Sequence, residues 1–431
     1  IYHSFEMPEG ATRLTVEFSY SPKRFEGVAG DNNIGLGLFD PQGARGAAHA
    51  RPNNDFTVSA IDATPGFVSG ALQSGTWSVV MDTHMIMPNA PVQIELDIQV
   101  TFDPITGSAP VYEKGVTAPR GTGWYRGDLH GHTIHSDGHW DVSDFVQYAR
   151  DYKLDFVTLT DHNTISGLAQ HDSYSSDDLL TMGGVELTTY NGHCLALGTR
   201  EWLEWRVRDG LSMPDIAQAV MDAGAYYIIA HPMSEGDPTC TGCDWQYVDM
   251  MPGNAPAVEI WNSPWDSISN NNDAVLLWYS WLNQGYRLVA TAGTDIHGPA
   301  QPDEKLGFDV VYAEGLSEAA ILNAIRQGHL YVSGGPTLEL TGNSASGKRA
   351  MMGDSLPQED TDIHIQWSGC ADGEHLRLVT DGKVIEEKLV EAHGEAHWNI
   401  AAAKYSWCVV EIRDAVSNLR ALTNPIYWRT A

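Results

Sequence analysis

The sequence has few basic residues for its size. It carries 25 Lys and Arg against 56 Asp and Glu, which gives 431 residues a formal net charge of −31. A field of this sign repels polyanions, so the composition argues against a general nucleic-acid-binding protein. The chain also lacks an apolar run near the roughly 18 residues that a membrane-spanning helix needs. No membrane span is therefore expected.

Cysteine is also scarce, with five residues in the chain: Cys194, Cys240, Cys243, Cys370 and Cys408. No second pair of ligands accompanies Cys240-Thr-Gly-Cys243 at the spacing of a zinc site, so a local disulfide or a reduced thiol pair is favoured. Cys370 and Cys408 lie in strand-like stretches and could form a bridge. Cys194 is expected to be a small buried apolar residue.

The chain begins at Ile1 rather than at methionine, which suggests that a leader segment has been removed. Together with the expected cysteine pairing, this favours an exported protein of the periplasm or the extracellular space. A cytoplasmic location is the alternative.

Length and pattern divide the sequence into three regions, because 431 residues are too many for one ordinary domain. Residues 1–118 alternate apolar and polar side chains, as at Leu14 and Val16, and predict a β-sandwich or jelly-roll module. Residues 119–335 alternate short apolar runs with helical segments. Residues 336–431 return to a β pattern and predict a second, C-terminal β-sandwich.

The central region has the element order of an α/β fold. Helical spacing begins at Val142, and Ser212 is a predicted helix N-cap with Asp215 at its N3 position. Strands that alternate with helices predict a mainly parallel sheet, open or closed into a barrel, with its site at the carboxyl ends of the strands. The apolar runs expected as strands cover 156–160, 226–230, 258–261 and 288–292.

Histidines and acids collect at these predicted strand ends. The segment Gly127–Gly138 reads GDLHGHTIHSDG, where His130 and His132 point to the same side of an extended chain. This pair alone is equally compatible with two hydrogen-bonded histidines, but TDHN, GGVE, AHP and GTDIH end the later runs. Only 17 residues of the chain are histidine, yet six stand at strand ends of one region: His130, His132, His162, His193, His231 and His297. Chance placement would scatter them.

A metal site explains this choice of residue types. Imidazoles and carboxylates together suit divalent manganese, iron or zinc, whereas carboxylates alone would suit calcium or magnesium. Glu186 is a candidate bridge, because a carboxylate can give one oxygen to each of two ions. Such ions lower the pKa of a shared water towards about 7 and polarise the bond under attack, so the pattern predicts hydrolysis. The sequence contains no G-x-S-x-G elbow and no P-loop that would offer another mechanism.

The motifs DLHGHTIHSDG, TDHN, GVE, AHP and GTDIH, in this order, resemble those of the PHP (polymerase and histidinol phosphatase) superfamily of metallohydrolases. Within it the chain looks most like the CehA/McbA-like branch, which the closing segment Thr423–Tyr427 also resembles. The resemblance covers roughly residues 120–335. It implies an α/β fold: a distorted (β/α)7 PHP barrel, flanked by N-terminal and C-terminal β-sandwich-like domains, with two or three divalent metal ions (Mn, Fe or Zn) in its cleft.

The resemblance also implies the ligands of each ion. The first ion would be held by His130, His132, Glu186 and Asp295. The second ion would be held by Glu186, His193 and His231. A third ion would be held by Asp137, His162 and His297. Asp295 or His297 would manage the proton, so the candidate catalytic residues are Asp295, His297 and Glu186.

Polar residues beside these motifs have a supporting role or none. Asp161 is expected to orient His162 or a loop amide rather than to bind metal. His135 and His139 could contact the substrate or remain solvated loop residues. Glu259 and Asn262 either line the cleft or are structural, and the tryptophan-rich segments are expected to serve core and loop packing rather than a sugar platform.

The leading functional hypothesis is a metal-dependent hydrolase in which a metal-bridged hydroxide attacks a small phosphomonoester or phosphodiester. Hydrolysis of a carbamate or carboxylic ester is the alternative, because the same hydroxide can attack a carbonyl carbon. A binding protein with a structural metal site is the second alternative, although such sites are usually closed and need only about four ligands. The sequence specifies neither the substrate nor the oligomeric state.

Overall fold

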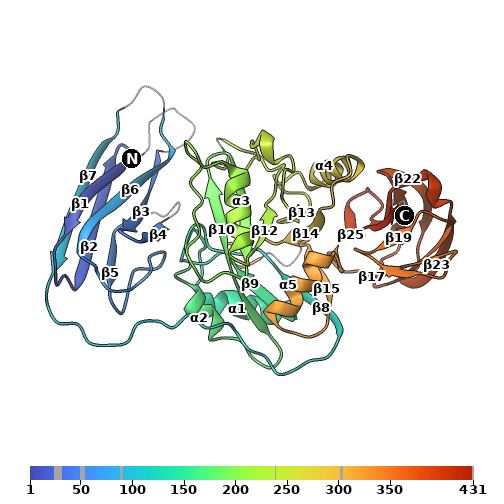
Figure 1. Ribbon diagram of the computed structural model, residues 1–431, viewed down its shortest axis with the longest axis horizontal. Helices are drawn as coiled ribbons and strands as arrows, with labels where there is room; N and C mark the ends of the chain where they lie inside the picture. Colours follow the sequence, from blue (N-terminus) through green and yellow to red (C-terminus); the bar gives the residue numbers. More distant parts are fainter. Residues whose placement is uncertain (24–31, 49–53, 88–90, 238, 301–303, 430–431) are drawn as a thin grey trace.

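The protein is described by a computed structural model that covers residues 1–23, 32–48, 54–87, 91–237, 239–300 and 304–429. Three parts of the chain lie in a row (Figure 1). The N-terminal strands form one end, the helices and most of the parallel strands form the middle, and the C-terminal strands form the other end. The domain boundaries expected after residues 118 and 335 stay predictions.

The N-terminal strands form two sheets around one apolar core. The sheet orders are β1-β6-β3-β4 and β5-β2-β7. Leu14 and Val16 of β2 and Trp77 of β6 are buried between them, as the alternation in the sequence predicts. The strands are β1 (Tyr2–Met7), β2 (Arg13–Ser21), β3 (Asn33–Asp40), β4 (Gly43–Ala48), β5 (Phe56–Ser59), β6 (Gly75–Met85) and β7 (Gln93–Thr101).

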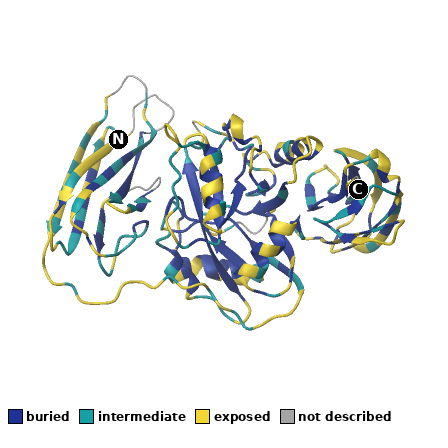
Figure 2. Ribbon diagram, in the orientation of Figure 1, coloured by how far each residue is buried: buried dark blue, intermediate teal, exposed yellow. Residues whose placement is uncertain are grey.

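The central part mixes strands and helices. Several of its strands are buried along their whole length, whereas the helices keep an exposed side (Figure 2). Its elements are β8 (Gly123–Asp128), α1 (Val142–Asp151), β9 (Phe156–Leu159), α2 (Leu168–Asp172), β10 (Leu180–Thr189), β11 (Gly192–Leu197), α3 (Met213–Asp222), β12 (Tyr226–Ile229), the 3-10 helix η1 (Val248–Met250), β13 (Ala257–Asn262), α4 (Asn271–Asn283), β14 (Val289–Gly293), β15 (Phe308–Ala313), α5 (Glu318–Gln327) and β16 (Leu330–Ser333).

The local signals for helices are confirmed. Helix α1 buries Val142, Phe145 and Val146 on one face, as their spacing predicts. Helix α3 begins with a capping box, in which the Ser212 hydroxyl accepts from the Asp215 amide and the Asp215 carboxylate accepts from the Ser212 amide.

The sheet is less parallel than the sequence predicts. Strands β8, β9 and β10 are parallel, as are β12, β13 and β14, but β11 runs antiparallel between β10 and β12. The expected strand end at Glu186 is wrong, because β10 continues to Thr189 and returns through Tyr190 and Asn191 as β11. A hairpin therefore takes the place of a helical crossover at this point.

The closed (β/α)7 barrel is not confirmed. Among the described strands, β14 forms no ladder with β15 or β16. Side chains bind its backbone instead: the Ala292 amide donates to Asp309 Oδ1 (3.2 Å), and the Ala290 amide donates to Asn424 Oδ1 (2.9 Å). Asn424 Nδ2 donates in turn to the carbonyls of Ala290 (2.9 Å) and Leu330 (3.1 Å). The open seam is thus bridged by a carboxylate and an amide rather than by a strand pair.

The C-terminal strands continue the central sheet. Strand β16 pairs with β25, and the same sheet extends through β24, β21 and β22, while β18-β17-β20-β23 form a separate sheet. Leu338, Ile363 and Val410 share a core between the two sheets. The elements are β17 (Thr337–Ser344), β18 (Arg349–Met351), β19 (Ser355–Pro357), β20 (Thr361–Ser368), β21 (His375–Thr380), β22 (Lys383–Leu389), β23 (His393–Ile400), the 3-10 helix η2 (Ala402–Lys404), β24 (Trp407–Arg413), β25 (Leu419–Thr423) and β26 (Ile426–Arg429).

The cysteines only partly follow the expectation. Cys240 and Cys243 form a disulfide, and Cys194 is buried. The possible bridge between Cys370 and Cys408 is wrong, because both are buried free thiols; Cys370 follows β20, whereas Cys408 lies within β24. The exported location stays a prediction. None of the helices in the described ranges has the length and apolar character needed to cross a membrane.

Candidate metal centre

The strand ends of the central sheet bring the nine predicted ligands into one buried cluster. His130 and His132 follow β8, His162 follows β9, and His231 follows β12. Asp295 and His297 follow β14, and Asp137 lies on the loop after β8. Glu186 and His193 come from the two strands of the β10–β11 hairpin. The structure therefore assembles side chains that are up to 167 residues apart in the chain, from 130 to 297.

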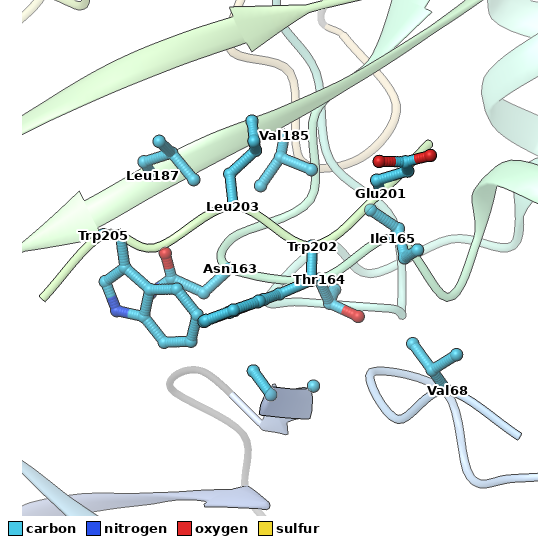
Figure 3. A pocket seen from close by; sticks show the side chains of 12 residues that line it. Val68, Asn163, Thr164, Ile165, Val185, Leu187, Glu201, Trp202, Leu203 and Trp205 are labelled. Carbon is cyan, nitrogen blue, oxygen red and sulfur yellow. The ribbon is translucent and has the colours of Figure 1, made fainter. Parts of the chain in front are cut away.

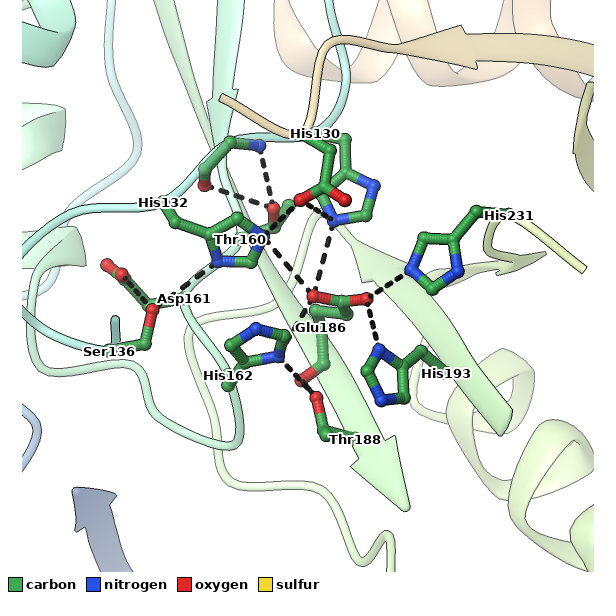
Figure 4. A network of polar contacts seen from close by, with 12 residues as sticks. His130, His132, Ser136, Thr160, Asp161, His162, Glu186, Thr188, His193 and His231 are labelled. Carbon is green, nitrogen blue, oxygen red and sulfur yellow. Dashed lines mark hydrogen bonds and ion pairs between the residues drawn. The ribbon is translucent and has the colours of Figure 1, made fainter. Parts of the chain in front are cut away.

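Glu186 is fully buried at the middle of the cluster and faces five imidazoles (Figure 4). Its Oε2 atom lies near His162 Nδ1 (2.9 Å), His130 Nε2 (3.2 Å) and His132 Nε2 (3.3 Å). Its Oε1 atom lies near His193 Nδ1 (3.0 Å) and His231 Nε2 (3.1 Å). The two oxygens thus divide the histidines into two groups, as a carboxylate shared by two ions would.

Two further carboxylates complete the cluster. Asp295 Oδ1 lies 2.9 Å from His132 Nε2 and 3.3 Å from His130 Nε2. Asp137 lies 3.2 Å from His297 Nε2 and 3.5 Å from His162 Nε2. Two groups have ligand atoms within 4.8 Å of one another: His130, His132, Glu186 and Asp295, and separately His132, Asp137, His162 and His297.

Four of the imidazoles are fixed by a hydrogen bond from the ring nitrogen that faces away from the cluster. Each donates one ring N–H to a fixed oxygen and turns its other nitrogen towards a carboxylate of the cluster. Such a bond selects the ring tautomer and its orientation, and it is typical of histidines that bind metal. The donors and acceptors are His130 Nδ1 and Glu259 Oε1 (3.1 Å), His193 Nε2 and the Thr241 carbonyl (3.2 Å), His231 Nδ1 and the Cys243 carbonyl (3.3 Å), and His297 Nδ1 and the Asp295 carbonyl (2.7 Å).

The cluster fits divalent ions. Four of its buried atoms have no hydrogen-bond partner within the described ranges: His130 Nε2, His132 Nε2, Asp137 Oδ1 and Glu186 Oε2. Buried polar atoms are rarely left in this state, because each would cost about 1–3 kcal/mol. All four face other ligand atoms at distances of about 3–4 Å, so an ion between them would satisfy them together.

The pKa values of two acids of the cluster and of His297 are shifted from their ordinary values. Burial alone would raise the pKa of Glu186, but His162, His130 and His193 outweigh it and hold that pKa well below its usual range. The pKa of Asp295 is lowered well below its usual range for the same reason, chiefly by His130. Burial alone would lower the pKa of His297, but Asp137 and Asp295 raise it to about 9. Without ions, the histidines therefore supply the positive charge that the carboxylates need.

Two of the predicted ligands have a strained backbone. His231 has φ +27° and Asp295 has φ +51°, in the left-handed region that residues with a Cβ seldom adopt. Each comes two residues after a strand end, and such strain persists only where the surroundings fix it. The His231 amide donates to Glu259 Oε2 (3.1 Å), and the Asp295 amide donates to the His130 carbonyl (2.9 Å).

Glu259 turns out to support the cluster. It accepts from the His130 ring, from the His231 amide and from Asn262 Nδ2 (3.0 Å), so one carboxylate positions residues from three strands. Asn262 also donates to Asp295 Oδ2 (3.3 Å). From the sequence, Glu259 and Asn262 could either line the cleft or be structural. The identity of a polar residue at a strand end does not indicate which side chains it contacts.

The residues beside the first motif lie close to the cluster. Asp161 accepts from the Thr133 amide (2.8 Å) and from the Ser136 hydroxyl (2.7 Å), which is the expected contact with a loop amide. His135 contacts the Ser166 hydroxyl (2.7 Å), and His139 is exposed. Their contact with a substrate stays a prediction.

One contribution from the N-terminal strands has no signal in the sequence. Asp82 and His84 of β6 line a cavity of about 180 Å³ together with Thr188, whose hydroxyl contacts the His162 ring. Burial lowers the pKa of His84, and the nearby charge of His162 lowers it further, whereas Asp82 opposes this. Only the packing of β6 against the central part brings these residues to the cluster.

A more apolar cavity of about 170 Å³ is lined by side chains of β10 and of residues 201–205 (Figure 3). Val185 and Leu187 line it, and these side chains alternate along β10 with Glu186, so the cavity is on the opposite face of the strand. Trp202 and Trp205 also line it, whereas Trp278 and Trp281 are buried in the core. Core packing is thus confirmed for Trp278 and Trp281, whereas Trp202 is exposed and lines a cavity.

No family model and no curated protein matches the chain. Among solved structures, a two-domain protein of Bacteroides vulgatus, described as containing a predicted PHP-like metal-dependent phosphoesterase, is similar at 18% identity over 74% of this chain and 100% of its own, with a TM-score of 0.41. A metal-dependent phosphoesterase of Bifidobacterium adolescentis has 18% identity over 46% and 94%, with a TM-score of 0.30. An amidohydrolase of Chromobacterium violaceum has 15% identity over 40% and 88%, with a TM-score of 0.29.

Two of these structures are described as metal-dependent phosphoesterases, one of them as PHP-like, which agrees with the resemblance to the PHP superfamily in the sequence. The CehA/McbA-like branch stays a prediction. Because these TM-scores are below 0.5, the neighbours carry no weight for the activity, which must be inferred from the cluster itself.

Proposed function

We propose that the protein is a metal-dependent phosphoesterase whose centre lies around Glu186. One observation carries this proposal: a buried carboxylate stands between five imidazoles, with unsatisfied nitrogen and oxygen atoms facing one another. Held tautomers and converging lone pairs are what a multinuclear centre needs, whereas a structural site needs only about four ligands.

The ligands divide among the proposed ions as the two Glu186 oxygens divide the histidines. His130, His132, Asp295 and Glu186 Oε2 would hold one ion, and His193, His231 and Glu186 Oε1 would hold another. Asp137, His162 and His297 would hold a third. The site contains four carboxylates when Glu259 is included, so two divalent ions would balance it, and a third would leave a positive excess that favours a phosphate ester.

Bound divalent ions would supply a hydroxide nucleophile at neutral pH and neutralise charge on the phosphoryl oxygens. The protein contributes the position of each ligand and the exclusion of bulk water, since Glu186, His130 and His132 are fully buried. His297 has the most exposed side chain of the six histidines, at 34%, and its Nε2 atom lies 3.2 Å from Asp137 Oδ1. If the centre holds only two ions, His297 is free of metal and is the candidate proton donor to the leaving oxygen.

A panel of substrates tests the activity. Purified protein with added Mn²⁺ or Zn²⁺ is assayed on p-nitrophenyl phosphate, bis-p-nitrophenyl phosphate and p-nitrophenyl acetate. We expect turnover of at least one phosphate ester. Turnover of the acetate without either phosphate would favour the carbamate or carboxylic ester hydrolase instead, and no turnover by metal-loaded protein would favour the binding protein.

The variant Glu186→Ala tests the role of the cluster. It removes the carboxylate that all five imidazoles share, and we expect turnover to fall below detection together with the ion content. Glu386→Ala on the exposed strand β22 is the matched control, and it should leave both unchanged. Turnover by Glu186→Ala protein that is verified to be metal-free would contradict the mechanism.

A further inference from the structure

The loop closed by the Cys240–Cys243 disulfide lies directly behind two histidines of the cluster. The carbonyl of Thr241 accepts from His193 Nε2 at 3.2 Å, and the carbonyl of Cys243 accepts from His231 Nδ1 at 3.3 Å. These two carbonyls, two residues apart within one four-residue loop, therefore fix the tautomers of both rings.

The opposite nitrogens of both rings meet at one oxygen. His193 Nδ1 lies 3.0 Å and His231 Nε2 lies 3.1 Å from Glu186 Oε1. A rotation of either ring would take its nitrogen away from this oxygen and break its bond to the loop. The geometry of this half of the cluster thus depends on where the loop holds its carbonyls.

The loop is itself closely packed. Gly242 has φ +74°, and a Cβ at this position would lie 2.0 Å from the Thr189 carbonyl at the end of β10. The Thr241 hydroxyl donates to the His84 carbonyl of β6 (3.1 Å), and Met233 and Asp244 form an isolated β-bridge at the base of the loop. Between these contacts, the disulfide is the covalent link that sets the shape of the loop.

We propose that the Cys240–Cys243 disulfide positions His193 and His231 for the ion that they share with Glu186, so that the redox state of this disulfide controls the affinity for that ion. This inference rests on the proposed function. Cys240, Thr241 and Cys243 are positioning residues, because they act through the two rings. Reduction opens the loop and releases the two carbonyls from their fixed places.

The reduction step is balanced with a phosphine reductant. The phosphine and one water convert the disulfide into two thiols, and the phosphine becomes its oxide. The released Cys243 sulfur belongs to a group with His193 and His231 whose ligand atoms lie within 4.8 Å of one another. A thiol at this position could bind metal, so the reduced protein needs comparison with a variant that has no sulfur there.

The experiment measures the affinity for Mn²⁺ and Co²⁺ by competition with a chelator, on the full chain, in three forms: oxidised, phosphine-reduced and Cys240→Ser/Cys243→Ser. We expect one ion to bind about 10–100-fold more weakly in the reduced protein and in the double variant, while the other sites keep their affinity. The reductant should not change the double variant any further, which controls for effects on the buried thiols of Cys194, Cys370 and Cys408.

Two results would overturn the inference. Equal affinity in all three forms would show that the loop holds the histidines without its disulfide. Tighter Co²⁺ binding after reduction, with a sulfur-to-metal charge-transfer band that the double variant lacks, would make Cys243 a ligand and not a positioning residue. If the oxidised protein itself binds no ion, the proposed function fails, and this outcome is distinct from the other two.

Discussion

Among the residues that the structure describes, two clusters of histidines and carboxylates have opposite surroundings. The cluster around Glu186 is buried, whereas His364, Glu395 and His397 form a smaller cluster on the outer face of β20 and β23. Strand register places His364 opposite His397, with ring centroids 4.1 Å apart. Similar residue types thus gather in both places.

The difference lies in what holds the rings. In the buried cluster, backbone carbonyls and Glu259 fix the outer nitrogens, so the inner nitrogens can only face the carboxylates. In the exposed cluster, His364 Nε2 contacts Glu395 (3.1 Å) and His397 Nδ1 contacts Asp362 (3.4 Å), and water competes for each. Exposed pairs of this kind contribute only about 0–1 kcal/mol. Residue type alone therefore does not make a metal centre.

The largest expected effect is the loss of turnover when metal is removed from the buried cluster. Dialysis against a strong chelator should abolish turnover, and added Mn²⁺ or Zn²⁺ should restore it, because the proposed chemistry needs the ions. Turnover and ion content are followed in the same samples. Full turnover by protein without stoichiometric ions would remove the functional distinction between the two clusters.

A smaller loss is expected when only a supporting carboxylate changes. Glu259→Gln keeps the size of the side chain but removes the charge that the His130 ring and the His231 amide contact. Metal affinity should fall by about 10–100-fold, as for other residues that orient ligands. The matched control is Glu395→Gln in the exposed cluster, and chelator competition on both variants measures the effect. Equal affinities would mean that Glu259 does not orient the ligands.

A buried histidine outside both clusters sharpens the comparison further. The His171 ring donates from Nε2 to the Val157 carbonyl (3.3 Å), and burial lowers its pKa to about 3, whereas Asp137 and Asp295 raise the pKa of His297 to about 9. Below the ordinary pKa of 6.5, unfolded His171 binds a proton that the folded chain refuses until about pH 3. The unfolded state then binds more protons, so the free energy of unfolding falls as the pH falls.

The variant His171→Gln measures how much His171 contributes to the pH dependence of the free energy of unfolding. From pH 7.5 to pH 5, the free energy of unfolding should fall by about 2 kcal/mol less in the variant than in the parent protein at equal metal content. Urea unfolding at the two pH values gives the comparison. The same pH dependence in both proteins would contradict a neutral, buried His171.

The smallest effect is expected in the exposed cluster. Glu395→Ala removes a carboxylate that contacts His364 and whose side chain is 60% exposed, so the free energy of unfolding should not change measurably. Urea unfolding at neutral pH checks this. A measurable loss would show that the exposed cluster is a built site like the buried one.

The sequence predicts the residues that meet but not how they are held. His130, His162, His231 and Asp295 follow apolar runs, and strand ends on one edge of a sheet must converge. Glu259 could not be assigned, because its role depends on packing against the His130 ring. His84 and the Thr241 carbonyl come from segments whose position only the tertiary structure sets.

The topology of the sheet was also only partly predictable from the sequence. Helix α3 follows from its capping residues, which act within a few positions of the chain. The β10–β11 hairpin and the open seam beside β14 depend on register and on the side chains of Asp309 and Asn424, which reach across more than a dozen residues of sequence. Such contacts leave no periodic signal, so the expected parallel barrel differed from the mixed open sheet.

Anomalous diffraction from crystals of the purified protein grown with Mn²⁺ tests the central claim most directly. We expect two or three strong peaks around Glu186, within bonding distance of the inner nitrogens of His130, His132, His193 and His231. Peaks at His364 and His397 alone, or no peak beside Glu186 in catalytically active protein, would contradict it.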